Sequence, residues 1–174
     1  MPATCSTQAR SRLNRSPLAA LASGALAVAF AASASAAESS TLAVAGFAFK
    51  DTSGEVRDQT AEHAARLKEF GAVLQDDLSA SPKLELVALP CEAGRCGDLG
   101  AIATQAKAAS ARYLLVGEVH KMSTLVGWVK FAVLDLSENK PVCDRYLTYR
   151  GDTDEAWRRA AAFTARDIGK YCLP

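Results

Sequence analysis

The segment TLAVAGFAF, residues 41–49, constrains the fold more than any other stretch of this chain. Its apolar side chains alternate to both sides of an extended backbone: Leu42, Val44 and Ala48 on one side, and Ala43, Ala45, Phe47 and Phe49 on the other. A strand that is apolar on both sides is typical of the centre of a sheet covered by helices. The segment therefore predicts a layered α/β (α+β) fold.

Three later segments have helical spacing. The first runs from about Thr60 to Ala80, before Ser81-Pro82, and repeats apolar residues every three or four positions: Leu67, Phe70, Leu74 and Leu78. The second follows Asp98, a suitable N-cap, and places one apolar face on Leu99, Ile102, Ala103, Ala106 and Ala109. The third opens with GDTDEAW, where Asp152 and Glu155 have capping-box spacing, and its predicted buried stripe is Trp157, Ala161, Thr164, Ile168 and Tyr171.

Four further strands are predicted at residues 84–89, 112–120, 124–136 and 141–150, the last two joined by a turn at 137–140. The order is then β-α-β-α-β-β-β-α. Helical crossovers make the early strands parallel, and the short connections make the last ones antiparallel. We expect one mixed five-stranded sheet with the helices packed on it.

Residues 1–36 have the pattern of an export signal. Arg10, Arg12 and Arg15 precede an Ala-rich apolar run, and Ala34-Ser35-Ala36 fits a signal-peptidase site. The run is short and interrupted by Ser23-Gly24, which is atypical of a membrane span. We therefore expect cleavage near Ala36, a single periplasmic or secreted domain over residues 37–174, and no membrane anchor in the mature form.

Without residues 1–36, the 20 Lys and Arg fall to 17 against 19 Asp and Glu, a formal net charge of −2. No block of basic residues remains in the mature chain. This excludes the electrostatic pattern of nucleic-acid binding and of polybasic membrane binding.

Three segments carry a resemblance to a known family: LAVAGFAFKDTSGE, ARYLLVGEVHKMSTLVGWVKFAVLDL and YRGDTDEAWRRA. They resemble a family of small predicted secreted bacterial proteins, a domain of unknown function of the 2380 or 3280 type, over about residues 41–160. Its best signatures are residues 151–157 and 116–119. The element order is more remotely similar to the amino-terminal domain of TolB and to the curli-secretion lipoprotein fold. These resemblances imply a role in envelope assembly, and the family resemblance also implies an association with periplasmic quinoprotein alcohol oxidation.

The mature chain has four cysteines, Cys91, Cys96, Cys143 and Cys172. An even number of cysteines in an exported protein indicates disulfides. Of the three possible connectivities we favour 91–96 and 143–172. Gly94 and Gly97 let the first loop curl, and the last helix has to fold back across the last strand.

Two other uses of the cysteines remain open. A zinc site is disfavoured by the C-x4-C spacing and by the presence of only two histidines, His63 on the expected polar side of a helix and His120 at a strand end. A redox thiol is compatible with Cys96, which precedes a helix whose dipole would favour a thiolate. We expect a structural staple, no metal and no cofactor.

The candidate binding surface is Glu118, Trp128 and Arg158. Glu118 interrupts an apolar strand, which is sometimes a functional sign, but a solvated face or a pair with a cross-strand cation such as Lys130 or Arg145 is favoured. Trp128, Tyr146 and Tyr149 could form a binding surface, but packing beneath the last helix is the favoured interpretation. Arg158 and Arg159 could bind an anion, and a solvent-facing position is favoured.

No catalytic residues are expected. The chain has no Gly-x-Ser-x-Gly elbow, phosphate loop or dinucleotide fingerprint. The sequence thus favours an exported, non-catalytic binding or assembly module of the cell envelope with a periplasmic protein partner, meeting that partner through a sheet edge or the loop near Cys91. The alternative is a thiol-redox or metal-delivery accessory to a periplasmic oxidoreductase system.

Overall fold

The computed structural model describes residues 39–89 and 98–173. The predicted leader and Cys91 and Cys96 lie outside these residues. The elements are β1 (Ser40–Val44), β2 (Ala48–Asp51), α1 (Thr60–Ser79), β3 (Leu84–Val87), α2 (Leu99–Ala108), β4 (Tyr113–Lys121), β5 (Val126–Asp135), β6 (Lys140–Arg150) and α3 (Asp154–Tyr171). The predicted order is confirmed, with the first strand divided into β1 and β2.

The strands form one mixed sheet in the order β3-β1-β4-β5-β6, and β2 also pairs with β4. β1 is parallel to β3 and β4, and β4, β5 and β6 form an antiparallel meander. The α/β class, the parallel early strands and the antiparallel late strands were all predicted correctly.

The first strand is interrupted because it holds one residue more than its neighbour. Leu42 lies opposite Tyr113, whereas Ala48 lies opposite Glu118, so six steps along the first strand match five along β4. The extra residue reverses the alternation, and Phe47 therefore joins Leu42 in the same core cluster. The predicted division of residues 41–49 into two faces is thus correct as far as Ala45, which shares a cluster with Ala43, and wrong from Phe47 onward.

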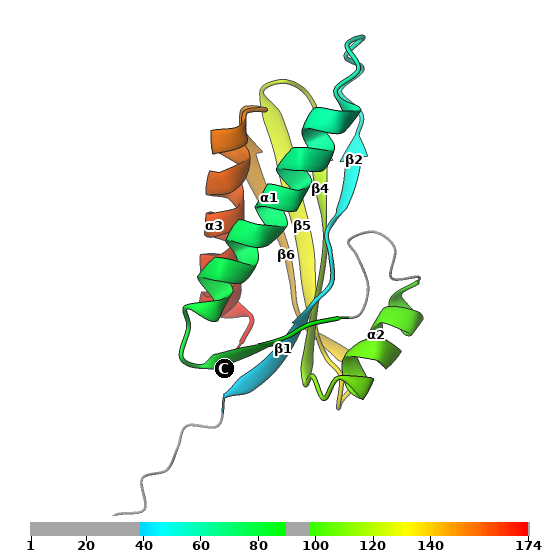
Figure 1. The fold of residues 1–174 in the computed structure, drawn as a ribbon, viewed down its shortest axis with the longest axis vertical. Coiled ribbons are helices and arrows are strands. Elements are labelled where there is room, and N and C mark those ends of the chain that lie inside the picture. Colours follow the sequence, from blue (N-terminus) through cyan, green and yellow to red (C-terminus); the bar gives the residue numbers. More distant parts are fainter. Residues whose placement is uncertain (1–38, 90–97, 174) are drawn as a thin grey trace, which may run out of the picture. The chain divides into compact units, whose positions relative to one another are not determined.

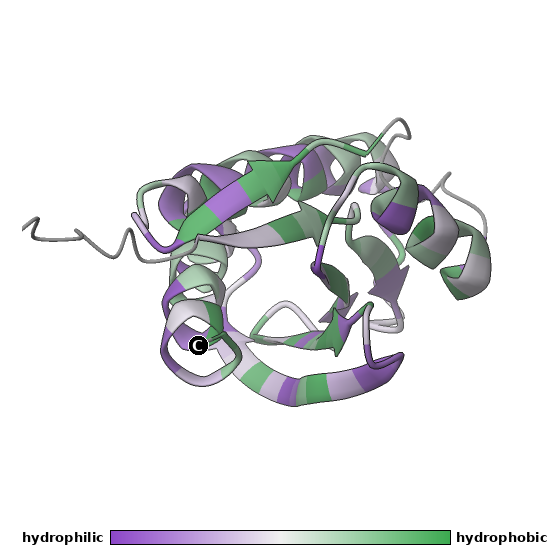
Figure 2. Ribbon diagram, turned by 90° about the horizontal axis from the view of Figure 1, so that it is seen from below, coloured by the Kyte–Doolittle hydropathy of each residue, from purple (hydrophilic) through white to green (hydrophobic). Residues whose placement is uncertain are grey.

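Helices α1 and α3 lie side by side over one face of the sheet (Figure 1), and both contribute to its main core. This core includes Phe70 and Leu74 of α1, Leu115 of β4, Phe131 of β5 and Trp157 of α3. Helix α2 packs on the other face, where Ala106 contributes to a smaller cluster with Ala43 and Leu114. In Figure 2 the turns of α3, beside the C mark, carry both hydrophobic and hydrophilic colours, as expected for a helix with one buried side.

Several local predictions need correction. His63 does not lie on a polar face of α1, because it is only 2% exposed. The cap of α3 is Thr153, whose side chain accepts a hydrogen bond from the Ala156 amide, so Asp152 is free for other contacts. Tyr171 is 56% exposed rather than part of the buried stripe. The Asp98 cap is confirmed, since its carboxylate accepts from the Ala101 amide.

Two glycines in the sheet make room for aromatic rings. A Cβ atom at Gly117 would lie 2.3 Å from the Phe47 ring, and one at Gly127 would lie 2.4 Å from the Tyr149 ring. Both contacts are far inside van der Waals distance, and the Phe47 ring is buried. Each glycine therefore allows an aromatic side chain to lie flat against the neighbouring backbone.

We expect Gly117→Ala to lower the free energy of unfolding by about 1–3 kcal/mol, because the methyl group would displace Phe47 from a packed core. Urea denaturation measures this. Gly71→Ala is the matched control: it lies in α1 with no atom within 4 Å of an added Cβ, so it should be neutral or stabilise by up to about 1 kcal/mol. Equal effects of the two changes would contradict the role of Gly117.

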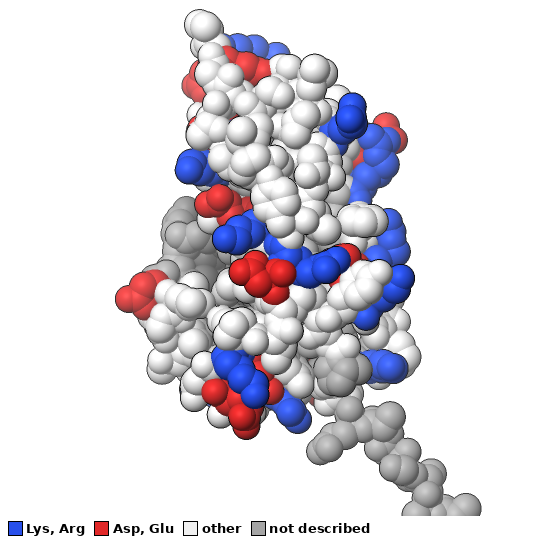
Figure 3. Space-filling model, turned by 180° about the vertical axis from the view of Figure 1, so that it is seen from behind, with Lys and Arg blue, Asp and Glu red and all other residues white. Residues whose placement is uncertain are grey.

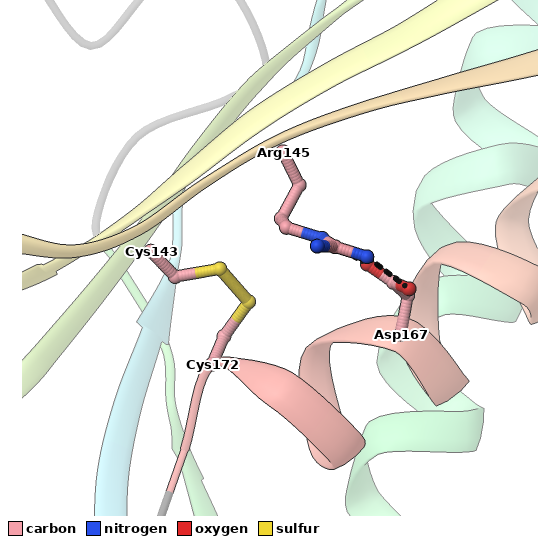
Figure 4. The surroundings of a disulfide bond; sticks show 4 residues. All are labelled: Cys143, Arg145, Asp167 and Cys172. Atoms are coloured by element: carbon pink, nitrogen blue, oxygen red, sulfur yellow. Dashed lines mark hydrogen bonds and ion pairs between the residues drawn. A yellow bond between two sulfur atoms is a disulfide. The ribbon is translucent and has the colours of Figure 1, made fainter.

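A disulfide joins Cys143 on β6 to Cys172 at the end of α3 (Figure 4). Beside it, the Arg145 guanidinium donates two hydrogen bonds to Asp167 of α3, at 2.8 and 3.0 Å. The same guanidinium lies 4.8 Å from the centroid of the Tyr171 ring. One covalent and one ionic link therefore hold the last turns of α3 against β6.

The bond closes a loop with a sequence separation of 29 residues. Replacing both Cys143 and Cys172 with Ser should lower the free energy of unfolding by about 3–4 kcal/mol, because the unfolded chain regains loop entropy. Chemical denaturation of the two forms measures the difference. Val142→Ser, an exposed change on the same strand, should have an effect below about 0.5 kcal/mol.

Candidate functional site

One face of the antiparallel half of the sheet is covered over most of its length by none of the helices α1, α2 and α3 that the described residues form. Helix α2 packs near Leu114 and Leu134, and the strands continue beyond it. The register places the outward-facing residues in rows across β2, β4, β5 and β6. One row holds Lys50, His120, Trp128 and Thr148, and the next holds Ala48, Glu118, Lys130 and Tyr146. We call these two rows the open face. The view from behind the molecule (Figure 3) shows uncharged surface crossed by a patch that contains both acidic and basic side chains.

Three aromatic rings from different strands meet on the open face. The Trp128 ring lies 4.9 Å from the Tyr146 ring and 5.1 Å from the His120 ring, measured between centroids. Tyr146 is 51% exposed, and the His120 Nε2 lies 2.7 Å from the Thr52 hydroxyl. Desolvation raises the pKa of Tyr146, which keeps its hydroxyl neutral. The cluster therefore presents apolar rings with polar tips to solvent.

Of the predicted surface residues, the structure brings two together. Glu118 and Trp128 lie on adjacent strands in neighbouring rows of the open face. Arg158 does not join them, because it lies on α3, beside Arg66 and Glu69 of α1. Its exposed position agrees with the solvent-facing interpretation.

Two predictions about neighbouring residues are wrong. Trp128 and Tyr146 do not pack beneath the last helix; only Tyr149 does, with its ring 6.2 Å from that of Trp157. Arg145 cannot pair with Glu118, because it reaches Asp167 on the helix side of the sheet. Lys130 lies directly opposite Glu118, although no ion pair forms between these two described residues.

A buried group of charges that was not predicted from the sequence lies where β2 and β4 end. Lys121 is 1% exposed, and its Nζ lies 2.8 Å from Glu55, 3.0 Å from Asp152 and 3.8 Å from Asp51. Asp152 also accepts hydrogen bonds from the Trp157 indole at 3.0 Å and from Arg66 at 3.1 Å, and lies 3.0 Å from His63 Nε2. We call the ionisable residues of this group the ionic cluster: Asp51, Glu55, His63, Arg66, Lys121 and Asp152. The one signal in the sequence was Asp152 within the family signature at residues 151–157.

The contacts of the ionic cluster keep Asp152 and Lys121 charged. Burial opposes the ionised form of Asp152, but hydrogen bonds from His63, Lys121 and Trp157 outweigh it and lower its pKa to about 2. Burial likewise opposes the charged form of Lys121, but Glu55 and Asp152 outweigh it and raise its pKa. A lysine that stays protonated and paired is no general base, so the cluster is a clamp between β4, α1 and the turn before α3.

The low pKa of Asp152 makes stability depend on pH. A carboxylate whose pKa is depressed by folding stabilises the protein above its ordinary pKa, and this contribution is lost as the pH falls towards the folded value. We expect about 2 kcal/mol to be lost between pH 4 and pH 2 through this group. Urea midpoints across that range measure it.

Asp152→Asn should flatten that pH dependence and destabilise the protein at neutral pH, because Lys121 would lose a charged partner in a buried position. Asp77→Asn, on the exposed side of α1, is the control and should leave the pH profile of the parent unchanged. A profile of Asp152→Asn as steep as that of the parent would contradict the assignment.

Within residues 39–89 and 98–173 no group of three metal-ligating side chains is positioned to hold an ion. In the same ranges, none of the helices has the length and apolar character needed to cross a bilayer.

A family model, DUF3280, described as "Protein of unknown function (DUF2380)", matches residues 40–168. The chain belongs to this family. The matched residues include β1 to β6 of the sheet and nearly all of α3. The family resemblance expected from the sequence is thereby confirmed. No curated protein matches the chain.

Solved structures share the fold at low sequence identity. The PelC dodecamer from Paraburkholderia phytofirmans is 16% identical, with a TM-score of 0.52 over 78% of this chain and 89% of that chain. Protein XCC0632 from Xanthomonas campestris, of family DUF330, is 14% identical, with a TM-score of 0.50 over 79% and 85%. The expected likeness to TolB also appears, with TolB from Acinetobacter baumannii at 14% identity and a TM-score of 0.48 over 77% of this chain and 28% of that chain.

Proposed function

We propose that this protein is a non-catalytic binding module of the bacterial cell envelope that meets a protein partner through its open face. The observation that carries the proposal is the aromatic cluster of His120, Trp128 and Tyr146 on a sheet surface that no helix of the described residues covers. Exposed Trp and Tyr side chains are the residues that most often dominate binding energy at protein interfaces. Glu118 and Lys130 beside them offer one charge of each sign for specificity.

The envelope assignment is supported by the export pattern at residues 1–36 and by the shared fold. PelC, which has the same fold, is a dodecamer, so this fold is compatible with assembly into larger complexes. We place the mature protein in the periplasm or outside the cell.

A non-catalytic role is supported by the chemistry of the ionic cluster. Its one buried lysine is held by carboxylates, and His63 contacts Asp152 on the same clamp, so neither side chain faces an open site as a reactive group. The thiol-redox alternative now depends on Cys91 and Cys96, because Cys143 and Cys172 are bonded to each other.

Photo-crosslinking in the native host tests the proposal. A photoreactive residue at position 146 should give a discrete adduct of defined mass, and Trp128→Ala in the same chain should reduce its yield at least fivefold, because about 1 kcal/mol or more of a hot spot is removed. Position 68, on the exposed side of α1, is the matched control site and should give no such adduct.

Adducts of equal yield from positions 146 and 68, or none from position 146, would overturn the assignment of the open face. Circular dichroism of Trp128→Ala shows whether a loss of crosslinking reflects unfolding. Tyr146→Phe, which keeps the ring, should retain the partner if the apolar face of the cluster carries the binding.

A further inference from the structure

A groove lies on the helix side of the molecule, between β6 and α3. It measures about 440 Å³ and is lined by apolar side chains of both elements, among them Leu147, Ala160 and Phe163. Phe163 is 50% exposed although it borders the groove. Because β6 is the last strand of the sheet, its free edge forms one rim of the groove.

The hydrogen-bond register shows which backbone groups face that free edge. The Gly151 amide donates to the Leu125 carbonyl at 3.0 Å, and these two residues are opposite each other when the β5–β6 register is extended by one step. Opposed residues in an antiparallel pair alternate between bonded and non-bonded positions. Tyr149 and Leu147 therefore bond to β5, and Tyr146, Thr148 and Arg150 direct their backbone N–H and C=O groups away from the sheet.

The two halves of the edge are protected differently. The first half contains Pro141 and pairs with β5 through a register irregularity at Val133/Leu134. It also carries Arg145, whose side chain is held on the helix side of the sheet by Asp167. Proline, bulges and inward-pointing charges are the devices that prevent a further strand from pairing. The half from Tyr146 to Arg150 has no proline and no bulge. It remains a template for an added strand.

Three arginines surround the groove: Arg150, Arg159 and Arg166. Arg159 pairs with Glu155, whereas no acidic side chain of the described residues forms an ion pair with Arg150 or Arg166. Among the described residues, no carboxylate lines the groove. A ligand that enters it would therefore meet positive charge above an apolar floor.

We propose that an extended, acidic segment of a protein partner adds to β6 as a further strand along Tyr146–Arg150. Its backbone would pair with the groups of Tyr146, Thr148 and Arg150, and its apolar side chains would enter the groove. Its carboxylates, on the other side of the added strand, would face Arg150. Main-chain pairing supplies affinity in this mode of recognition, and the side-chain positions supply specificity. The inference builds on the binding role proposed above and adds the class of ligand.

A synthetic peptide tests the inference on the full mature protein. The probe is the end-blocked peptide TVEVEVT, followed by backbone amide NMR. Binding should shift the amide signals of residues 146–150 and slow hydrogen exchange at Thr148 and Arg150. The same peptide with N-methyl groups on alternate residues cannot donate along one edge, so it should bind at least tenfold more weakly, as should the lysine analogue TVKVKVT.

Charge reversal tests Arg150. Arg150→Glu should weaken binding of TVEVEVT about tenfold and improve binding of TVKVKVT. Arg158→Glu, at an exposed arginine of α3 outside the groove, should change neither. Position 150 is exposed, and denaturation of each variant checks that the fold is retained.

Equal affinity for the acidic, basic and N-methylated peptides, or signal changes confined to other elements, would overturn strand addition. The two proposals fail separately. Trp128→Ala should leave peptide binding intact. If the peptide does not bind but crosslinking from position 146 persists, strand addition is overturned and the proposal for the open face stands. If the peptide binds but that crosslink does not form, the proposal for the open face is overturned and strand addition stands.

Discussion

A sheet has two faces, and residues 39–89 and 98–173 supply three helices to cover them. Two of the helices, α1 and α3, cover the same face and enclose the main core, which includes Phe70, Leu115 and Trp157. The ten residues of α2 cover only the part of the other face around Leu114 and Leu134. The exposed strand surface, its aromatic cluster and the free edge of β6 all follow from this unequal coverage.

The unequal coverage is compatible with the sheet because its two halves differ. Parallel strands are usually buried on both faces, whereas antiparallel strands tolerate water on one. The helix that crosses between β3 and β4 therefore covers the parallel half, and the meander β4–β5–β6 stays open. Burial alternates along β5 in agreement with this arrangement. Val129 and Phe131 are buried on the covered face, and Lys130 is exposed on the open face.

The ionic cluster joins segments that are far apart in the chain. Asp152 precedes α3, His63 and Arg66 lie on α1, and Lys121 ends β4. Each member has several partners, which is the condition under which buried ions are tolerated. The disulfide and the Arg145–Asp167 pair hold α3 at its other end, so the helix is fixed to the sheet near both termini.

Local patterns in the sequence determined the elements. The apolar spacing of α1, the Asp98 cap and the meander of the last strands depend on neighbours within a few residues, and these predictions were correct. Tertiary structure decided which side chain meets which. His63 is polar, yet it is buried because Asp152, distant in sequence, lies against it. Trp128 is aromatic, yet it stays partly exposed because α1, α2 and α3, the helices of the described residues, do not cover its row. The spacing of apolar residues predicts which side chains share one side of a helix or strand. Only the placement of the helices decides what covers that side.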